Sequence, residues 1–224
     1  MVVAMKNVVE SNSELATDER SLLSRAYRYA ISSCRLSWRV ISIIELEAQG
    51  FERQREMVKA YREQIENELK DICYELLSLL DKYLIPTVTT IESKVFYLKM
   101  KGDYYRYLTE ITTGNEQRKF IEESKHAYKN GFDIAQDQMT VTHPMRLNLA
   151  LNLSVFCYEF LSETDLACHL AKKAFDGAVS GLDCISGDSY KDSTIIMQLL
   201  RDNLKVWTKN QHDLNDIDQS REQQ

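Results

Sequence analysis

Two pairs of cations at helical spacing are the residues of this sequence best suited to bind an anion. Arg28 and Arg35 are seven residues apart, as are Lys99 and Arg106, and Tyr107 follows directly. Seven residues make two helical turns, so each pair lies on one helix face, roughly 10 Å apart. Cations converging from two helices can hold a phosphate dianion, and a tyrosine hydroxyl adds a neutral donor. Spacing alone favours a plainer interpretation, in which these are separate surface charges paired with nearby acids.

Asparagines within two apolar helix faces are the second candidate feature. Asn152 lies in the segment LNLALNLSVFCYEF beside Glu159, and Asn203 lies in a later apolar segment. An amide offers both a donor and an acceptor, the pair needed to hydrogen-bond an extended peptide backbone. A helix–helix core containing two hydrogen-bonded asparagines explains the pattern equally well. The apolar neighbours of the two asparagines are Leu151, Val155, Ile195, Ile196, Leu199 and Trp207.

Residues for catalysis or metal binding do not assemble into a site. The four histidines lie in different segments without metal-ligand spacing. Glu123 and His126 match the Glu-x-x-His unit of di-iron bundles, but such a bundle needs that unit twice and the sequence holds it once. Cys168 and His169 are adjacent, so a helix would point them about 100° apart, which is wrong for a nucleophile and its base. No glycine-rich phosphate loop is present. We therefore predict a non-catalytic protein with no metal and no cofactor.

Composition narrows the class of protein further. The 224 residues include only 7 Gly and 2 Pro, too few to supply the turns of an all-β fold. The net charge of −6 argues against a general nucleic-acid binder, which needs a basic field. No apolar run approaches the ~20 residues that span a bilayer. Five scattered cysteines without a Cys-x-x-Cys pair indicate reduced thiols. These features predict a cytoplasmic protein, with the nucleus as a second compartment, that does not bind nucleic acid and does not span a membrane.

Helical periodicity runs through almost the whole chain and predicts one all-α domain over residues 1–209. Thr17 or Asp18 is expected to cap the second helix, Pro86 to stop the third, and Pro144 to occupy the first turn of the sixth. The segment 210–224 is polar and aperiodic, which predicts a disordered tail. The eight helices are expected at about 1–11, 17–50, 51–84, 92–112, 117–138, 144–161, 165–182 and 189–207.

Three long motifs resemble one known family. YKDSTIIMQLLRDNLKVWTK, residues 190–209, is similar to the C-terminal signature of the 14-3-3 phosphoprotein-binding proteins almost residue for residue. RSLLSRAYR, residues 20–28, is similar to their N-terminal signature, and SKVFYLKMKGDYYRYL, residues 93–108, is equally typical. The resemblance implies a cup of antiparallel helices that pairs into a dimer with two grooves. It also decides between the interpretations that spacing left open.

The resemblance assigns roles to the residues already singled out. It implies that the phosphate of a phosphoserine or phosphothreonine binds to Arg28, Arg35, Arg106 and Tyr107, with Lys99 alongside. Asn152 and Asn203 would hold the partner's backbone, and Glu159 would lie near the groove. The apolar wall of the groove would consist of Leu151, Val155, Ile195, Ile196, Leu199 and Trp207.

The sequence departs from the family pattern at several places, among them Cys34 and Leu36, which flank Arg35 where family members often have small or basic residues. Arg28 stands where the family usually carries lysine, and Asn148 replaces a usual glycine on the groove floor. The chain also begins about one helix late, so the family's first helix, which packs on the partner subunit, is expected to be missing. Ser37, Ile41 and Tyr61 resemble the receiving half of that dimer interface. We therefore expect a weakened homodimer or a heterodimer with a paralogue.

The sequence thus predicts a regulatory adaptor that binds phosphorylated segments of client proteins in an amphipathic groove and so modulates their activity, location or interactions in signalling. The alternative is a phosphate-independent helical scaffold. In that case Asn148 and the missing helix would have impaired the groove while leaving the fold intact.

Overall fold

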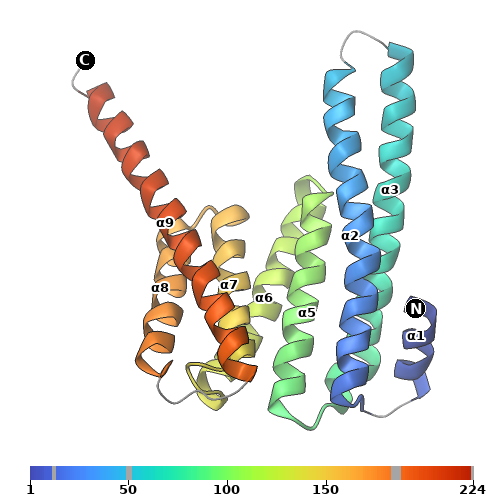
Figure 1. Cartoon of the computed structure of the whole chain (residues 1–224). Coiled ribbons are helices and arrows are strands. Elements are labelled where there is room, and N and C mark those ends of the chain that lie inside the picture. Colours follow the sequence, from blue (N-terminus) through green and yellow to red (C-terminus); the bar gives the residue numbers. More distant parts are fainter. Residues whose placement is uncertain (12–13, 49–51, 183–187, 223–224) are drawn as a thin grey trace. The chain divides into compact units, whose positions relative to one another are not determined.

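Every regular element that the structure describes is helical. The computed structural model describes residues 1–11, 14–48, 52–182 and 188–222 (Figure 1). The contacts within the chain divide it into two compact units, Met1–Ser124 and Lys125–Gln224, which we call unit 1 and unit 2. The all-α class predicted from the sequence is confirmed. The assignment of residues 1–209 to one domain stays a prediction.

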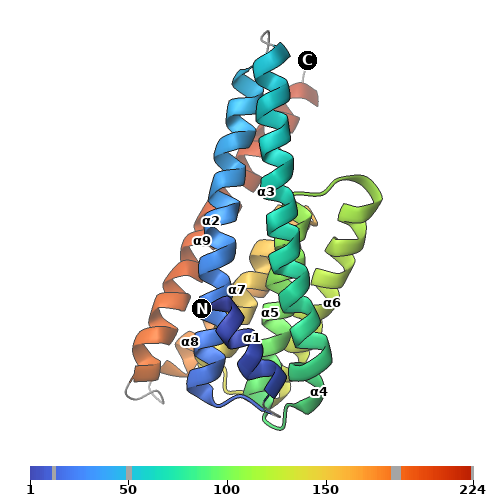
Figure 2. The same ribbon diagram turned by 90° about the vertical axis from the view of Figure 1, so that its right-hand side faces the viewer.

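Unit 1 is built around two long helices that lie side by side in both views (Figures 1 and 2). They are α2, Thr17–Glu47, and α3, Glu52–Leu79. Leu23, Tyr27 and Ile31 of α2 are fully buried, as are Leu69 and Leu76 of α3. These residues recur at intervals of three, four or seven, so each helix presents one apolar stripe to the core. The remaining elements are α1 (Val2–Ser11), η1 (Leu80–Leu84), α4 (Ile85–Thr87), α5 (Ile91–Glu110) and the first part of α6 (Gly114–Gln138).

A hydrogen-bonded carboxylate ties three of these helices together. Glu75 of α3 accepts a hydrogen bond from the Tyr27 hydroxyl of α2 (2.7 Å) and another from Lys6 Nζ of α1 (3.0 Å). The bond from Tyr27 is the largest cause of a lowered pKa for Glu75, and the bond from Lys6 adds to it. Glu75 therefore joins α1 to the α2–α3 pair through its charged form.

Two predicted helix ends differ from the observed ones. α2 begins at Thr17 with Ala16 in the capping position, where Thr17 or Asp18 was expected to cap it. The Ala16 N–H donates to the Glu19 carboxylate (2.9 Å), which is one half of a capping box, whereas Ala16 has no side-chain oxygen to accept from the first turn. The third helix was expected to stop near Leu84, but helical structure continues through Thr87. A π-helical turn, in which the Ile85 N–H reaches the Leu80 carbonyl, precedes Pro86 and makes room for a residue that lacks an N–H.

Unit 2 packs α7 (Pro144–Glu159), α8 (Thr164–Ser180) and α9 (Asp188–Glu222) with the end of α6. Pro144 occupies the first turn of α7 as predicted, and His143 Nδ1 caps that helix by accepting from the Met145 N–H (3.1 Å). Leu149, Phe156 and Leu200 are fully buried. The core of unit 2 is therefore apolar and fixes the outward faces of α7 and α9.

The last helix is longer than expected. α9 continues to Glu222, whereas the sequence predicted an end near Trp207. No glycine or proline interrupts residues 188–222, so nothing in the backbone chemistry stops the helix. Disorder of residues 210–224 stays a prediction. Residues 223–224 and Cys184 lie outside the described residues, and in the described part of the chain no helix is long and apolar enough to cross a membrane.

Candidate anion-binding site

A cluster of cations forms in unit 1 where α2 and α5 bring their charged faces together. Arg35 of α2 makes a two-pronged contact with the Glu110 carboxylate of α5, from Nε to Oε2 (2.9 Å) and from Nη2 to Oε1 (2.6 Å). Arg106, one turn before Glu110, donates from Nη1 to the same Oε1 (3.4 Å). Both guanidinium groups also lie over the Tyr107 ring, with Cζ-to-centroid distances of 4.3 Å for Arg35 and 4.9 Å for Arg106. The structure thus brings Arg35, Arg106 and Tyr107 together, and their binding of phosphate stays a prediction.

Arg28 and Lys99 flank this centre. Arg28 is exposed and donates to the Ser24 hydroxyl (3.2 Å), and it forms no ion pair with any described residue. Its charge acts on Tyr104, whose ring lies 5.3 Å from that of Tyr107. Lys99 pairs with Asp103 one turn along α5 (2.8 Å). Arg28 therefore has its guanidinium largely available to a ligand, while Lys99 is held by an acid.

Two residues that the sequence reasoning missed belong to the cluster. Glu110 receives Arg35 and Arg106, and Arg39 also pairs with it at 3.7 Å. Both had a signal in the sequence, since Arg39 follows Arg35 by four residues and Glu110 follows Arg106 by four. Side chains four residues apart share a helix face, so this spacing could have completed the set.

The cluster keeps a positive charge despite its acids. Arg28, Arg35, Arg39, Lys99 and Arg106 are five cations, while Asp103 and Glu110 are two carboxylates, which leaves a formal charge of +3. Desolvation is the main cause of a raised pKa for Tyr107, with a contribution from Asp103, although Arg106 and Arg35 act in the opposite direction. The Tyr107 hydroxyl therefore stays protonated as a neutral donor beside the guanidinium groups.

The second predicted set of residues lies in unit 2. Asn152 of α7 and Asn203 of α9 are both half-buried, so neither is simply a core residue. Leu151 and Val155 are half-buried beside Asn152, and Glu159 is exposed. Among the predicted wall residues of α9, Ile195 and Leu199 are exposed. Ile196 and Trp207 are instead buried, and Trp207 stacks on Tyr158 with ring centroids 4.9 Å apart.

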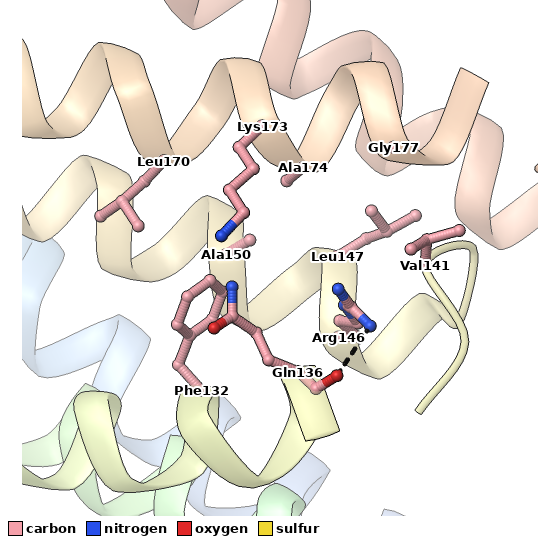
Figure 3. Close-up of a pocket in the computed structure, with 10 residues that line it drawn as sticks. All are labelled: Phe132, Gln136, Val141, Arg146, Leu147, Ala150, Leu170, Lys173, Ala174 and Gly177. Atoms are coloured by element: carbon pink, nitrogen blue, oxygen red, sulfur yellow. Dashed lines mark hydrogen bonds between the residues drawn. The ribbon is translucent and has the colours of Figure 1, made fainter. Parts of the chain in front are cut away.

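Two cavities open in unit 2, and they differ in what lines them. A cavity of about 280 Å³ is lined by Ile195 and Ile196, two of the predicted wall residues, and by Asn148, which was expected on the groove floor. A smaller cavity lies between α6, α7 and α8 and holds none of the predicted site residues (Figure 3). There Arg146 donates to the backbone carbonyl groups of Gln136 (3.2 Å) and Met139 (2.7 Å). These two hydrogen bonds satisfy carbonyl groups at the C-terminal end of α6. No group of three or more His, Cys, Asp or Glu side chains in the described residues is placed to hold a metal.

The predicted interface residues lie on α2 and α3 of unit 1. Ser37 and Tyr61 are exposed, and Ile41 is half-buried. All three are therefore open, at least in part, to contact from another chain.

The described part of the chain is a set of packed helices that brings several arginines together in unit 1. The family model described as 14-3-3 protein matches residues 1–208 of this chain. The chain belongs to the 14-3-3 family.

Relatives from several animals agree with this assignment. The chain is 64% identical over 198 residues to 14-3-3 protein homolog 2 of Schistosoma mansoni, covering 88% of this chain and 92% of that protein. It is 56% identical over 208 residues to 14-3-3-like protein 2 of Caenorhabditis elegans, with 93% and 84% covered. It is 55% identical over 217 residues to 14-3-3 protein beta/alpha-1 of Oncorhynchus mykiss, with 96% and 89% covered. Membership of this family gives the chain the role of a non-catalytic adaptor or regulator.

Proposed function

We propose that this chain binds phosphoserine- or phosphothreonine-containing segments of partner proteins, with the phosphate held by the cation cluster of unit 1. One observation carries the proposal: Arg35 and Arg106, from two different helices, converge on a single carboxylate beside Tyr107. A carboxylate and a phosphate present similar oxygen acceptors to a guanidinium group. The position that Glu110 fills is therefore chemically suited to a phosphate.

A bound phosphate would take over donors that Glu110 now uses. A phosphate monoester carries a charge of about −1.5 to −2 at pH 7 and three acceptor oxygens, so it can engage Arg28, Arg35 and Arg106 together. The formal charge of +3 remains attractive after the two acids are counted. Tyr107 would add a neutral hydroxyl donor, and Lys99 would add charge from one side.

Unit 2 would supply the contacts to the rest of the partner segment. Asn152 and Asn203 are half-buried amides with both a donor and an acceptor, which suits a peptide backbone. Leu151, Val155, Ile195 and Leu199 keep apolar surface available for its side chains. The buried Ile196 and Trp207 would support this surface from within, and the exposed Glu159 would lie at its edge. Such binding would modulate a client's activity, location or interactions in the cytoplasm and also in the nucleus.

The experiment is fluorescence anisotropy with a labelled Arg-Ser-x-pSer-x-Pro peptide and its unphosphorylated twin at two salt concentrations. We expect binding of the phosphorylated form alone, weakening as salt rises because the cluster acts through charge. Equal binding of the two peptides would instead support the phosphate-independent scaffold. Absence of binding to both would remove the proposed function.

We also propose that Ser37, Ile41 and Tyr61 form part of a dimer interface. The exposed Tyr61 and Ser37 offer contact area, and a phosphate on Ser37 would add negative charge there. Sedimentation velocity of the parent and of Ser37→Asp tests this, with Ser21→Asp as the control on an exposed serine that lies about 160° round the same helix. We expect Ser37→Asp to shift the chain toward monomer and Ser21→Asp to leave it unchanged. Identical sedimentation of all three proteins would remove Ser37 from the interface.

A further inference from the structure

α2 carries a row of exposed apolar side chains that the proposed function does not use. Leu22, Tyr29, Leu36 and Ile43 are 45%, 83%, 63% and 56% exposed. They are spaced seven residues apart, so they lie on one helix face over six turns. The four side chains lie roughly 10 Å apart along the helix, with the exposed Arg25 and Ser32 between them, so they form a row of separate apolar contact points rather than one continuous patch. Single exposed hydrophobic residues are ordinary on a protein surface, but four at a regular spacing on one helix face can each receive an apolar side chain of a partner. We call these four residues the outer row.

The outer row runs beside the cations of the same helix. Tyr29 directly follows Arg28, and Leu36 directly follows Arg35. One residue turns an α-helix by about 100°, so the two rows occupy neighbouring faces of α2. Tyr27 marks the core face, and Tyr29 lies about 200° further round, on the side away from the core. α2 thus presents a charged face and an apolar face side by side.

We propose that the outer row binds an aromatic or aliphatic side chain of the same partner segment whose phosphate binds to the cation cluster. This inference rests on the proposed function. It means that α2 contacts both the phosphate and an apolar side chain near it in the partner segment. A step of 100° around a helix of about 11 Å diameter is roughly 10 Å, and an extended peptide covers that distance in about three residues. The apolar residue is therefore expected about three positions from the phosphorylated one.

Charge decides between this occupant and a second copy of the chain. Joining two outer rows from two copies would bring Arg28, Arg35 and Arg39 of each copy toward those of the other. Like charges at such a contact disfavour it, whereas a phosphorylated segment brings the opposite charge. Tyr29 is also the most exposed member of the row, and tyrosine provides a large contact area at little cost in side-chain entropy.

The test uses two pairs of phosphopeptides, and the two members of a pair differ only in having leucine or serine at one position. That position is three residues before the phosphoserine in one pair and three residues after it in the other. Binding is measured for the parent chain and for the double variant Tyr29→Ser/Leu36→Ser. The matched control is Val3→Ser/Val179→Ser, which removes two exposed apolar side chains elsewhere, on α1 and α8. Circular dichroism checks that all three proteins keep their helices.

We expect the parent and the control to prefer a leucine peptide over its serine counterpart by about tenfold, the scale of burying one such side chain. The double variant should bind both peptides equally, at the affinity that the parent shows for the serine peptide. A parent that binds both phosphopeptides equally well would overturn the inference and leave the proposed function standing, as would a double variant that keeps the preference. The double variant could lose the preference for leucine and also sediment differently from the parent. That result would show that the outer row takes part in self-association, and it would overturn the inference. Failure of every phosphopeptide to bind would overturn the proposed function and this inference with it.

Discussion

The two units of this chain differ in how they use charge. In unit 1, ion pairs join helices that are far apart in sequence: Arg35 and Glu110 join α2 to α5, and Lys6 and Glu75 join α1 to α3. In the described part of unit 2 the ion pairs include Lys125–Glu163 and Lys205–Asp202, whose side chains are 42% to 67% exposed. Unit 2 offers half-buried amides and apolar side chains instead. The proposed function uses this difference, because it assigns the recognition of phosphate to unit 1 and the recognition of the peptide chain to unit 2.

Replacing Arg35 with alanine should cause the largest loss of phosphopeptide affinity, because it removes the recognition of charge by unit 1. The variant loses both hydrogen bonds that now reach Glu110 and would reach a phosphate. Hydrogen bonds to charged groups contribute about 1.5–3 kcal/mol, so phosphopeptide affinity should fall by about 10- to 150-fold. Anisotropy titration measures it, and Arg201→Ala on the exposed face of α9 is the control. A phosphopeptide that binds Arg35→Ala as tightly as the parent would show that the cluster is not the phosphate site.

Glu110→Gln should affect the stability of the free chain and its response to phosphopeptide in opposite directions. The free chain should unfold more easily, by about 1–3 kcal/mol, because three arginines lose their shared anion. The rise in Tm on adding phosphopeptide should grow, because the ligand then replaces a missing charge. Differential scanning fluorimetry with and without peptide measures both effects. Glu63→Gln, which removes an exposed pair with Lys59, serves as the control and should change neither.

The amides of unit 2 should have a smaller effect than the arginines. Asn152→Ala or Asn203→Ala removes a neutral hydrogen bond, worth about 0.5–1.5 kcal/mol, so affinity should fall by about 2- to 10-fold. The salt dependence of binding should stay that of the parent, because no charge is lost. Titration at two salt concentrations separates this result from that of Arg35→Ala. A changed salt dependence in Asn152→Ala would contradict the division between the units.

Lowering the pH should reduce the stability of unit 1 through the protonation of Glu75, and this is the smallest of the predicted effects. Hydrogen bonds from Tyr27 and Lys6 lower the pKa of Glu75 below its ordinary 4.5. Its contribution to stability is therefore present above about pH 4.5 and is lost as the pH falls through the lowered value. Between about pH 5 and pH 3 the free energy of unfolding should fall for both proteins. The fall should be about 0.5 kcal/mol smaller for Glu75→Gln than for the parent. Urea unfolding at a series of pH values measures this, and parallel curves for parent and variant would exclude the effect.

Periodicity predicted the helices well because almost every one has an apolar stripe and a local signal at its ends. Pro144 and the break at Gly114, which has a positive φ of 64°, are examples. The end of the third helix was predicted wrongly because Pro86 was read as a stop. A π turn around Leu80–Leu84 admits that proline without ending the helix.

The candidate site was predictable only as far as its cations. Arg28, Arg35, Lys99, Arg106 and Tyr107 stand at helical spacing, and the family resemblance selected them. What spacing did not supply was the partner of Arg35, because its pairing with Glu110 is a tertiary contact between residues 75 positions apart. The spacing of Arg106 and Glu110 is visible in the sequence, but the contact of Glu110 with Arg35 became visible only in the structure.

In the proposed function, the carboxylate of Glu110 would let the cluster distinguish a phosphate from other acidic groups. An aspartate or glutamate side chain of a partner is the same chemical group as the one already paired with Arg35 and Arg106. Exchanging one carboxylate for another gains neither charge nor hydrogen bonds, so acidic segments have little advantage over the internal acid. A phosphate brings a second charge and a third oxygen, which gives it a net gain in the same exchange. In the proposed function, a ligand must therefore gain more binding free energy than the Glu110 carboxylate that it replaces. An aspartate substituted for the phosphoserine of a client would not gain enough and should bind poorly.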